Sequence, residues 1–229
     1  MVTLAIVLSA AVIALLAGYA MWIVVTWRHY GSPIRPSLAE ADLLLDRFMP
    51  SYDVVERHHL RIDAPADRVL ASASRMDLSS LALVRAIVRA RQLLLNARDE
   101  KETPSMGLLD YTRSIGWGDL ATAPGREVVL GAITRPWEPA VTFQRLSPDV
   151  FRTFNEPGFV KIAWTLRADP RADGGSDFRT ETRAIATDET ARRRFRWYWA
   201  RFSAGIALIR WAMLKPLKRD AERAVASRA

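Results

Sequence analysis

The pattern of apolar and polar positions predicts one long helix near the C-terminus, over residues 188–215. Asp188 or Thr190 can cap its N-terminus, and the stretch contains no proline. Its arginines fall largely off the apolar stripe. A helix with this many aromatic residues on its buried side needs a broad, curved surface to pack against. Steps of three and four residues place these side chains on one stripe: Phe195, Tyr198, Phe202, Ile206, Ile209 and Met213.

The chain before this helix contains segments in which polar and apolar residues alternate, as is typical of β-strands. Residues 52–63 have a period of two, so that Glu56 and His58 share one face with three apolar residues. Residues 159–167 and 177–187 flank a turn rich in Pro, Gly and Asp and should form an antiparallel hairpin. Four further strands are expected at residues 115–122, 127–134, 141–145 and 150–154.

Two helices are expected between the first and second strands. One covers residues 67–75, and another, capped by Asp77 or Ser79, runs to about Leu95. Residues 96–110 are polar and are expected to form a loop. This order of elements is that of an α+β protein whose helices lie on one face of an antiparallel sheet.

The N-terminal segment, residues 2–27, contains 26 residues without a charge. A bilayer span needs about 20 apolar residues, so this segment is long enough to cross with some tilt. Trp22 and Trp27 near its end fit the aromatic belt of a membrane interface. No Lys or Arg precedes it, which favours an anchor over a cleaved signal peptide. Because Arg28 and Arg47 follow it, the positive-inside rule predicts a single-pass cell-membrane protein with a cytoplasmic C-terminal domain.

The remainder of the chain begins with a linker. Ser37 with Glu40 has the capping-box pattern that opens a helix over residues 38–49. At the other end Pro216 disfavours continuation of the long helix, so we expect a short, loosely held basic tail at the membrane surface. The predicted division is a transmembrane anchor at residues 1–27, a linker with a juxtamembrane helix at 28–51, a folded domain at 52–215 and a basic tail at 216–229.

The net charge of +8 is concentrated near the C-terminus. Residues 190–229 contain eleven Lys or Arg and two Asp or Glu, so the rest of the chain is close to neutral. A basic segment of this kind indicates an anionic partner, either lipid headgroups or nucleic acid. We interpret residues 192–196 as a solvated face. For the tail after Lys215 we favour anionic lipid over nucleic acid, because the anchor already offers a membrane as partner.

Several kinds of chemical site are absent from the sequence. It contains no cysteine, which excludes disulfides, thiolate metal ligands and cysteine nucleophiles. His58 and His59 are adjacent in a strand, so they point to opposite faces and cannot chelate one ion together. Neither a glycine-rich phosphate loop nor a Gly-x-Ser-x-Gly elbow occurs. We therefore assign no catalytic residue, no metal and no cofactor.

Several segments resemble the START-like superfamily, also called SRPBCC or helix-grip, which includes polyketide cyclases and birch-pollen allergens. The resemblance covers about residues 52–215, and the similar stretches are 63–69, 124–131, 155–162, 180–183 and 194–199. It implies a curved antiparallel sheet wrapped around a long C-terminal helix, here preceded by one N-terminal transmembrane helix. It also implies a cavity between sheet and helix for an apolar small molecule. Because the superfamily hosts carriers, sensors and enzymes alike, the fold does not choose among these functions.

The implied cavity gives a set of candidate ligand-contacting residues. If the strand face that carries Glu56 and His58 is concave, both side chains point into the cavity, where they could bind a polar group of the ligand or act as a general base. Alternatively, they pair with arginines near the cavity mouth. Glu181 and Arg183 share a face of the last strand and are expected to form a structural ion pair. The full set of cavity candidates is Glu56, His58, Trp117, Trp164, Trp197, Tyr198, Phe202 and Ile206.

The sequence therefore supports three hypotheses of function. The first is a membrane-anchored binding or carrier module for a lipid or another hydrophobic small molecule. The second is a cyclase- or aromatase-like enzyme of the same fold, with Glu56 or His58 as its acid or base. The third and least favoured is a binder of an anionic surface or of nucleic acid through residues 192–228.

Overall fold

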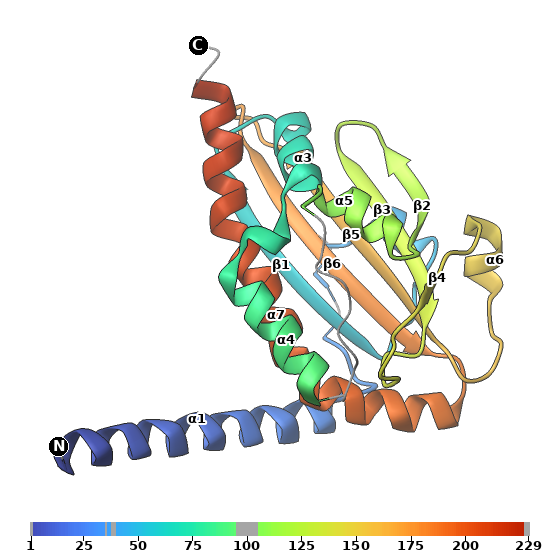
Figure 1. Cartoon of the computed structure of the whole chain (residues 1–229). Coiled ribbons are helices and arrows are strands. Elements are labelled where there is room, and N and C mark those ends of the chain that lie inside the picture. The colour runs from blue at the N-terminus through green and yellow to red at the C-terminus, as the bar shows by residue number, and fades with distance from the viewer. Residues whose placement is uncertain (1, 35, 38–39, 95–104, 227–229) are drawn as a thin grey trace.

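The computed structural model describes residues 2–34, 36–37, 40–94 and 105–226, and it has an α+β fold (Figure 1). In this part of the chain, six antiparallel strands form one curved sheet with the order β1-β6-β5-β3-β2, and β4 pairs with β3. The strands are β1 (Val54–Ile62), β2 (Gly118–Ala123), β3 (Glu127–Thr134), β4 (Phe143–Gln144), β5 (Val160–Pro170) and β6 (Ser176–Ala186).

The helices are distributed unequally between the two faces of the sheet. Figure 1 shows α3, α4, α5 and α7 gathered on one side, as the sequence predicted for an α+β protein. The helices are α1 (Val2–His29), α2 (Leu43–Asp46), α3 (Ala66–Arg75), α4 (Ala82–Leu94), α5 (Leu108–Ser114), α6 (Pro148–Thr153) and α7 (Glu189–Ala226), with a 3-10 turn at Leu78–Ser80.

The alternation of side chains defines the two faces of the sheet. Residues opposite each other in register face the same side, so Glu56, Thr182 and Trp164 form one row across β1, β6 and β5. This side, which we call the inner face, packs against α3, α5 and α7. Burying one large apolar side chain contributes about 1.5–3 kcal/mol, so the core holds these helices on the sheet. Its buried members include Ile62, Val69, Trp117, Leu130, Trp164, Leu166, Phe178, Met213 and Leu217.

Helix α7 is longer than the sequence predicted. It continues through Pro216, and Leu217 and Ala221 beyond that proline are fully buried in the main core. The expectation of a loosely held tail after Pro216 is therefore wrong for residues 217–226. The reason is tertiary: a proline inside a helix costs roughly 3 kcal/mol, and burying a leucine and its neighbours against the sheet offsets a cost of that size.

The opposite side of the sheet, the outer face, is covered by the segment that follows α1. Leu45, Phe48 and Met49 pack there against Val129 and Ala163. The expected juxtamembrane helix is shorter than predicted, because it begins at Leu43 with Asp42 as its cap, Leu45 N donating to Asp42 Oδ1 at 2.8 Å. The predicted Ser37–Glu40 contact forms, with Ser37 N donating to Glu40 Oε2 at 3.1 Å, but residues 38–39 lie outside the described part.

Two other predictions of local structure are wrong. Residues 150–154 were expected to be a strand and belong mostly to α6, which begins at Pro148, a residue whose fixed φ suits the first turn of a helix. The loop expected at 96–110 contains the start of α5 at Leu108. In both places short apolar runs are helical because they pack on the sheet, which local periodicity does not reveal. Residues 95–104 lie outside the described part.

Helix α1 is attached to α7 by directed contacts near its C-terminal end. Tyr19 Oη donates to the Arg201 carbonyl at 2.7 Å, and Trp22 Nε1 donates to Ser203 Oγ at 3.0 Å. The Arg196 guanidinium donates twice to the carbonyl of Trp27, at 2.7 and 3.0 Å. The rest of α1 projects away from the domain with its apolar side chains exposed (Figure 1). By length and composition, Ile6–His29 could cross a membrane.

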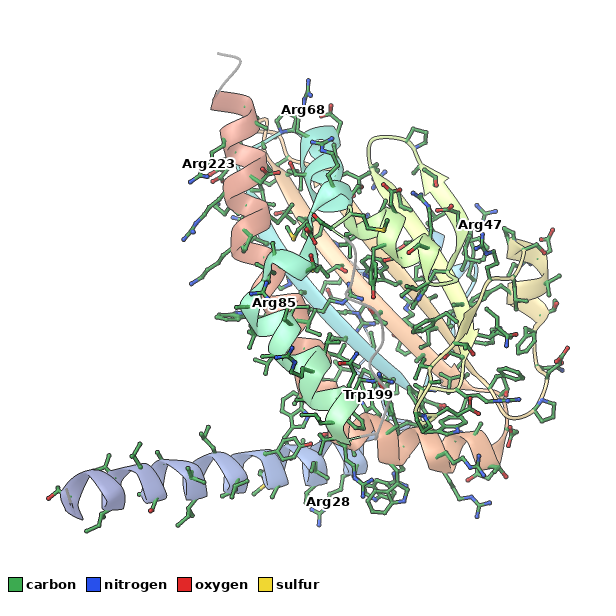
Figure 2. The ribbon with its side chains drawn as sticks, viewed as in Figure 1. Arg28, Arg47, Arg68, Arg85, Trp199 and Arg223 are labelled. Carbon is green, nitrogen blue, oxygen red and sulfur yellow. The ribbon has the colours of Figure 1, made fainter. Side chains whose placement is uncertain are left out.

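The side of the domain toward which α1 projects carries exposed basic residues. Figure 2 shows Arg85 on α4 and Arg223 on α7 along this side. Trp211 on α7 is 56% exposed, and Lys215 lies over its ring at 5.7 Å from the centroid. The domain thus has basic and aromatic side chains on the part of its surface that α4 and α7 form.

Candidate ligand-binding site

A group of polar side chains lies on the inner face, where the surroundings are otherwise apolar. Three strands and α7 contribute to it. In register, Thr180 lies opposite His58, and Thr182 lies opposite both Glu56 and Trp164. We call this group the inner polar cluster; it consists of Glu56, His58, Trp164, Thr180, Thr182 and Arg210.

Arg210 reaches from α7 to the central strand of the sheet. Its Nη2 donates to Thr182 Oγ1 at 3.0 Å, and its Cζ lies 4.5 Å from the centroid of the Trp164 ring, a cation–π distance. Burial lowers the pKa of Arg210 to about 10, with the negative charge of Glu56 acting in the opposite direction. The guanidinium therefore remains charged at neutral pH, and the side chain is half-buried.

Glu56 and His58 form a pair on β1. His58 Nε2 lies 2.8 Å from Glu56 Oε1, and the two side chains are 18% and 20% exposed. The distance fits an ion pair, but the buried Nε2 has no hydrogen bond of acceptable geometry among the described residues. The pair lies on the inner face, as the sequence predicted if that face were concave, and it keeps some access to solvent. This leaves it able to contact a bound molecule.

Trp164 and Trp117 provide apolar surface next to the inner polar cluster. Trp164 is 2% exposed, and its Nε1 donates to Thr180 Oγ1 at 2.8 Å, which satisfies the buried N–H. The two indole rings meet edge to face at 6.4 Å, and Phe143 lies 5.4 Å from Trp117. Both tryptophans belong to the main core.

The candidates on α7 divide into two groups. Tyr198, Phe202 and Ile206 are half-buried, and the rings of Tyr198 and Phe202 lie 4.8 Å apart. Trp197 is 51% exposed and lies 4.3 Å from the ring of Trp27 on α1. The structure therefore brings Trp197 together with α1 and not with the inner polar cluster.

Sequence reasoning did not select Thr180, Thr182 or Arg210. The spacing of Ile206, Arg210, Met213 and Leu217, at steps of four, three and four, places Arg210 on the buried face of α7. Counting Ile209 instead of Arg210 in the stripe concealed this. A charged residue at a core position of a helix was thus the signal available in the sequence.

The outer face carries a separate network of charged residues. Arg57 Nε lies 2.9 Å from Glu181, and Arg183 contacts both Glu181 at 2.6 Å and Asp46 of α2 at 2.5 Å. Asp46 thus joins the predicted Glu181–Arg183 pair and ties α2 to β6. An open cavity of about 270 Å³ lies beside this network. Acidic and basic side chains are balanced in its lining: Glu40, Asp42, Asp177 and Glu181 with Arg57, Arg61, Arg167 and Arg179.

The histidines do not combine into a metal site in the described part of the chain. His58 and His59 belong to opposite faces, as alternation along β1 requires. Among the described residues, no group of three or more His, Asp or Glu side chains is arranged to hold a metal ion.

No family model matches the sequence, and no curated protein matches it. Similar solved structures include CalU16 from Micromonospora echinospora, with 14% identity, 76% of this chain and 86% of that chain covered, and a TM-score of 0.26. Protein CV1439 from Chromobacterium violaceum has 13% identity, with 68% of this chain and 95% of that chain covered and a TM-score of 0.26. Zhui aromatase/cyclase from Streptomyces sp. R1128 has 14% identity, with 75% and 94% covered and a TM-score of 0.23. The TM-scores are low, so the fold assignment rests on the strand order and on α7. A curved antiparallel sheet with one long C-terminal helix on its inner face is a helix-grip fold.

Proposed function

We propose that this protein is a membrane-anchored binding or carrier module for a lipid or another hydrophobic small molecule, held between the inner face of the sheet and α7. The observation that supports this most is the inner polar cluster. A few convergent polar groups within an apolar surface are typical of small-molecule sites, because they fix the orientation of an otherwise apolar ligand. Glu56, His58 and Arg210 have this arrangement.

The anchoring part of the proposal is supported by α1 and its contacts. The helix is apolar over the length that a bilayer requires, and its side chains are exposed, which is costly in water. Trp22, Trp27 and Trp197 gather at its C-terminal end, where amphipathic rings suit the membrane interface. Arg28 follows directly, which favours a cytoplasmic domain.

The exposed basic residues on α4 and α7 would add attraction to an anionic leaflet. Each Lys or Arg near such a surface contributes about 1 kcal/mol. Arg85, Lys215 and Arg223 are exposed and available for this role. We therefore propose an anionic membrane, and not nucleic acid, as the partner of these basic residues.

Binding is tested with the full chain in lipid nanodiscs, incubated with a lipid extract and analysed by native mass spectrometry. Wild type should carry a stoichiometric apolar adduct. Ile206→Trp places a larger side chain between α7 and the sheet and should lose the adduct, whereas Leu208→Trp, at a position 46% exposed on the same helix, should retain it. No adduct in wild type, or equal adducts in both variants, would count against a site between sheet and helix.

A second candidate function is catalysis of the cyclase or aromatase kind. The specific observation in its favour is the Glu56–His58 pair, since a carboxylate beside an imidazole is a common acid–base arrangement. In that case Glu56→Gln would abolish turnover of a bound polyketide-like substrate and leave its binding intact. A binding module would show no chemical change in the ligand recovered from either protein.

A further inference from the structure

Two arginines on opposite faces of the sheet differ in how their charge is balanced. Arg183 on the outer face is 1% exposed and has two carboxylates as partners, Glu181 and Asp46. Arg210 on the inner face has one hydroxyl partner and one ring partner. Among the described residues, no carboxylate lies within ion-pair distance of its guanidinium.

This difference matters because even a partly desolvated cation, such as half-buried Arg210, is costly without a counter-charge. An arginine cannot avoid the cost by releasing its proton at neutral pH. Glu56 acts on Arg210 only through space, and its carboxylate already lies 2.8 Å from His58. The free N–H groups of Arg210 and its unbalanced charge are therefore suited to an anionic group that the chain itself does not supply.

We propose that Arg210 binds the carboxylate of an amphipathic ligand, that is, a molecule with one carboxylate headgroup and an apolar tail of the fatty-acid type. This inference rests on the proposed function, since it names the ligand class of the same site. The tail would lie against the half-buried apolar residues that surround the cluster, which include Leu60, Ile162 and Ile206.

The geometry of the guanidinium favours a carboxylate. The Trp164 ring covers one face of the group and Thr182 accepts from Nη2, while the other N–H groups have no partner among the described residues. Hydrogen bonds to a guanidinium lie in its plane, so stacking on Trp164 leaves its edges free for a bidentate pair. Glu56 nearby disfavours a second negative charge on the ligand. A monoanion is therefore preferred to a phosphate dianion.

The test measures how much dodecanoate, dodecanol and dodecyl phosphate is retained by nanodiscs that contain the full chain, with empty nanodiscs of the same lipid as the baseline. Wild type should bind dodecanoate about tenfold more tightly than dodecanol. Arg210→Gln should weaken dodecanoate binding by roughly 10- to 100-fold, because a hydrogen bond to a charged group contributes a free energy of that size. It should leave dodecanol binding unchanged. Arg219→Gln, at an exposed position of the same helix, should change neither.

Arg210→Lys is the second variant. It keeps the charge but cannot donate a bidentate pair, so it should retain the preference for dodecanoate at reduced affinity. Unchanged dodecanol binding by each variant reports that the site is folded. If Arg210→Gln fails to fold, the comparison of Arg210→Lys with wild type decides the matter, because equal affinity for dodecanoate would overturn the proposal.

The three probes separate this inference from the proposed function. Binding of dodecanoate and dodecanol with equal affinity, unaffected by Arg210→Gln, would overturn the carboxylate assignment and leave a general apolar site. Tighter binding of dodecyl phosphate than of dodecanoate would overturn it in favour of a phosphate headgroup. Binding of none of the probes above the empty-nanodisc baseline would overturn both proposals together.

Discussion

The buried carboxyl group of Glu127 should make the stability of the protein fall as pH rises. Glu127 lies on β3 at the outer face and is 4% exposed. Burial, followed by the charge of Asp42 and a hydrogen bond with it, raises the pKa of Glu127 well above its ordinary value of 4.5. Thr165 Oγ1 donates to Glu127 Oε1 at 3.1 Å and acts in the opposite direction, but burial outweighs it.

The sign and size of the effect follow from proton linkage. Between pH 4.5 and the raised pKa, the folded protein holds one proton on Glu127 that the unfolded chain has released. The free energy of unfolding therefore falls by about 1.4 kcal/mol for each unit of rising pH in this window, and this group costs nothing below pH 4.5. Between pH 5 and pH 7 the loss from Glu127 alone amounts to roughly 2–3 kcal/mol, a large share of the stability of an ordinary domain.

Glu127→Gln is the cleanest perturbation. The amide can still donate to Asp42 and accept from Thr165, so it replaces the protonated carboxyl with a group of similar shape that does not titrate. Relative to wild type, the variant should gain roughly 2–3 kcal/mol between pH 5 and pH 7. Glu156→Gln, at an exposed position, is the matched control and should follow wild type at every pH.

The assay is urea denaturation of the full chain in a non-ionic detergent, followed by tryptophan fluorescence at pH 5, 6 and 7. Ionisable groups that the three proteins share contribute equally to each and cancel in the differences. Parallel pH profiles for wild type and Glu127→Gln would refute the reasoning, because they would mean that Glu127 is ionised in the folded protein. Asp42 is also the cap of α2, so Glu127 is linked to the segment that follows α1.

Three further predictions concern the core, the inner face and the anchor. Leu217→Ala should lower the free energy of unfolding by about 2–5 kcal/mol because Leu217 is fully buried. Lys215→Ala, at an exposed position, should change it by no more than about 0.5 kcal/mol. Equal urea midpoints for the two variants would show that α7 is not part of the core beyond Pro216. Thr180→Val should lower the free energy of unfolding by about 1–3 kcal/mol in the same assay, because it leaves the buried Trp164 N–H without an acceptor. An unchanged free energy of unfolding would mean that water replaces the hydroxyl. Ser203→Ala removes the acceptor of Trp22 Nε1 and should broaden the distribution of spin-label distances between α1 and the domain. Ser105→Ala, at an exposed position, is the control. A distribution for Ser203→Ala equal to that of wild type would contradict a fixed position of α1 on the domain.

The strand pattern was predictable because alternation on β1 is directly visible in the sequence. Glu56 and His58 lie on the inner face because side chains alternate along a strand. The long C-terminal helix was predicted from its apolar stripe, and the resemblance to a helix-grip family implied that the sheet wraps around it. Trp197 was wrongly predicted to line the cavity, because an aromatic residue near the edge of the apolar stripe of α7 can pack either on the sheet or on another helix. Its actual neighbour, Trp27, belongs to α1, whose position on α7 depends on long-range contacts. No local pattern encodes a contact between residues so far apart in the chain.

Arg210 shows most clearly where sequence reasoning fails. A 3.6-residue period allows both position 209 and position 210 near the centre of a stripe, and hydropathy alone selects the isoleucine. The structure turns Arg210 inward because its long side chain reaches Trp164 on β5, and because Thr182 of β6, in the same row as Trp164, accepts a hydrogen bond there. Both partners come from strands of the sheet, far from Arg210 in the chain. The position of a charge inside the fold is therefore a property of the assembled sheet and helix, and the unbalanced charge of this residue becomes visible only in three dimensions.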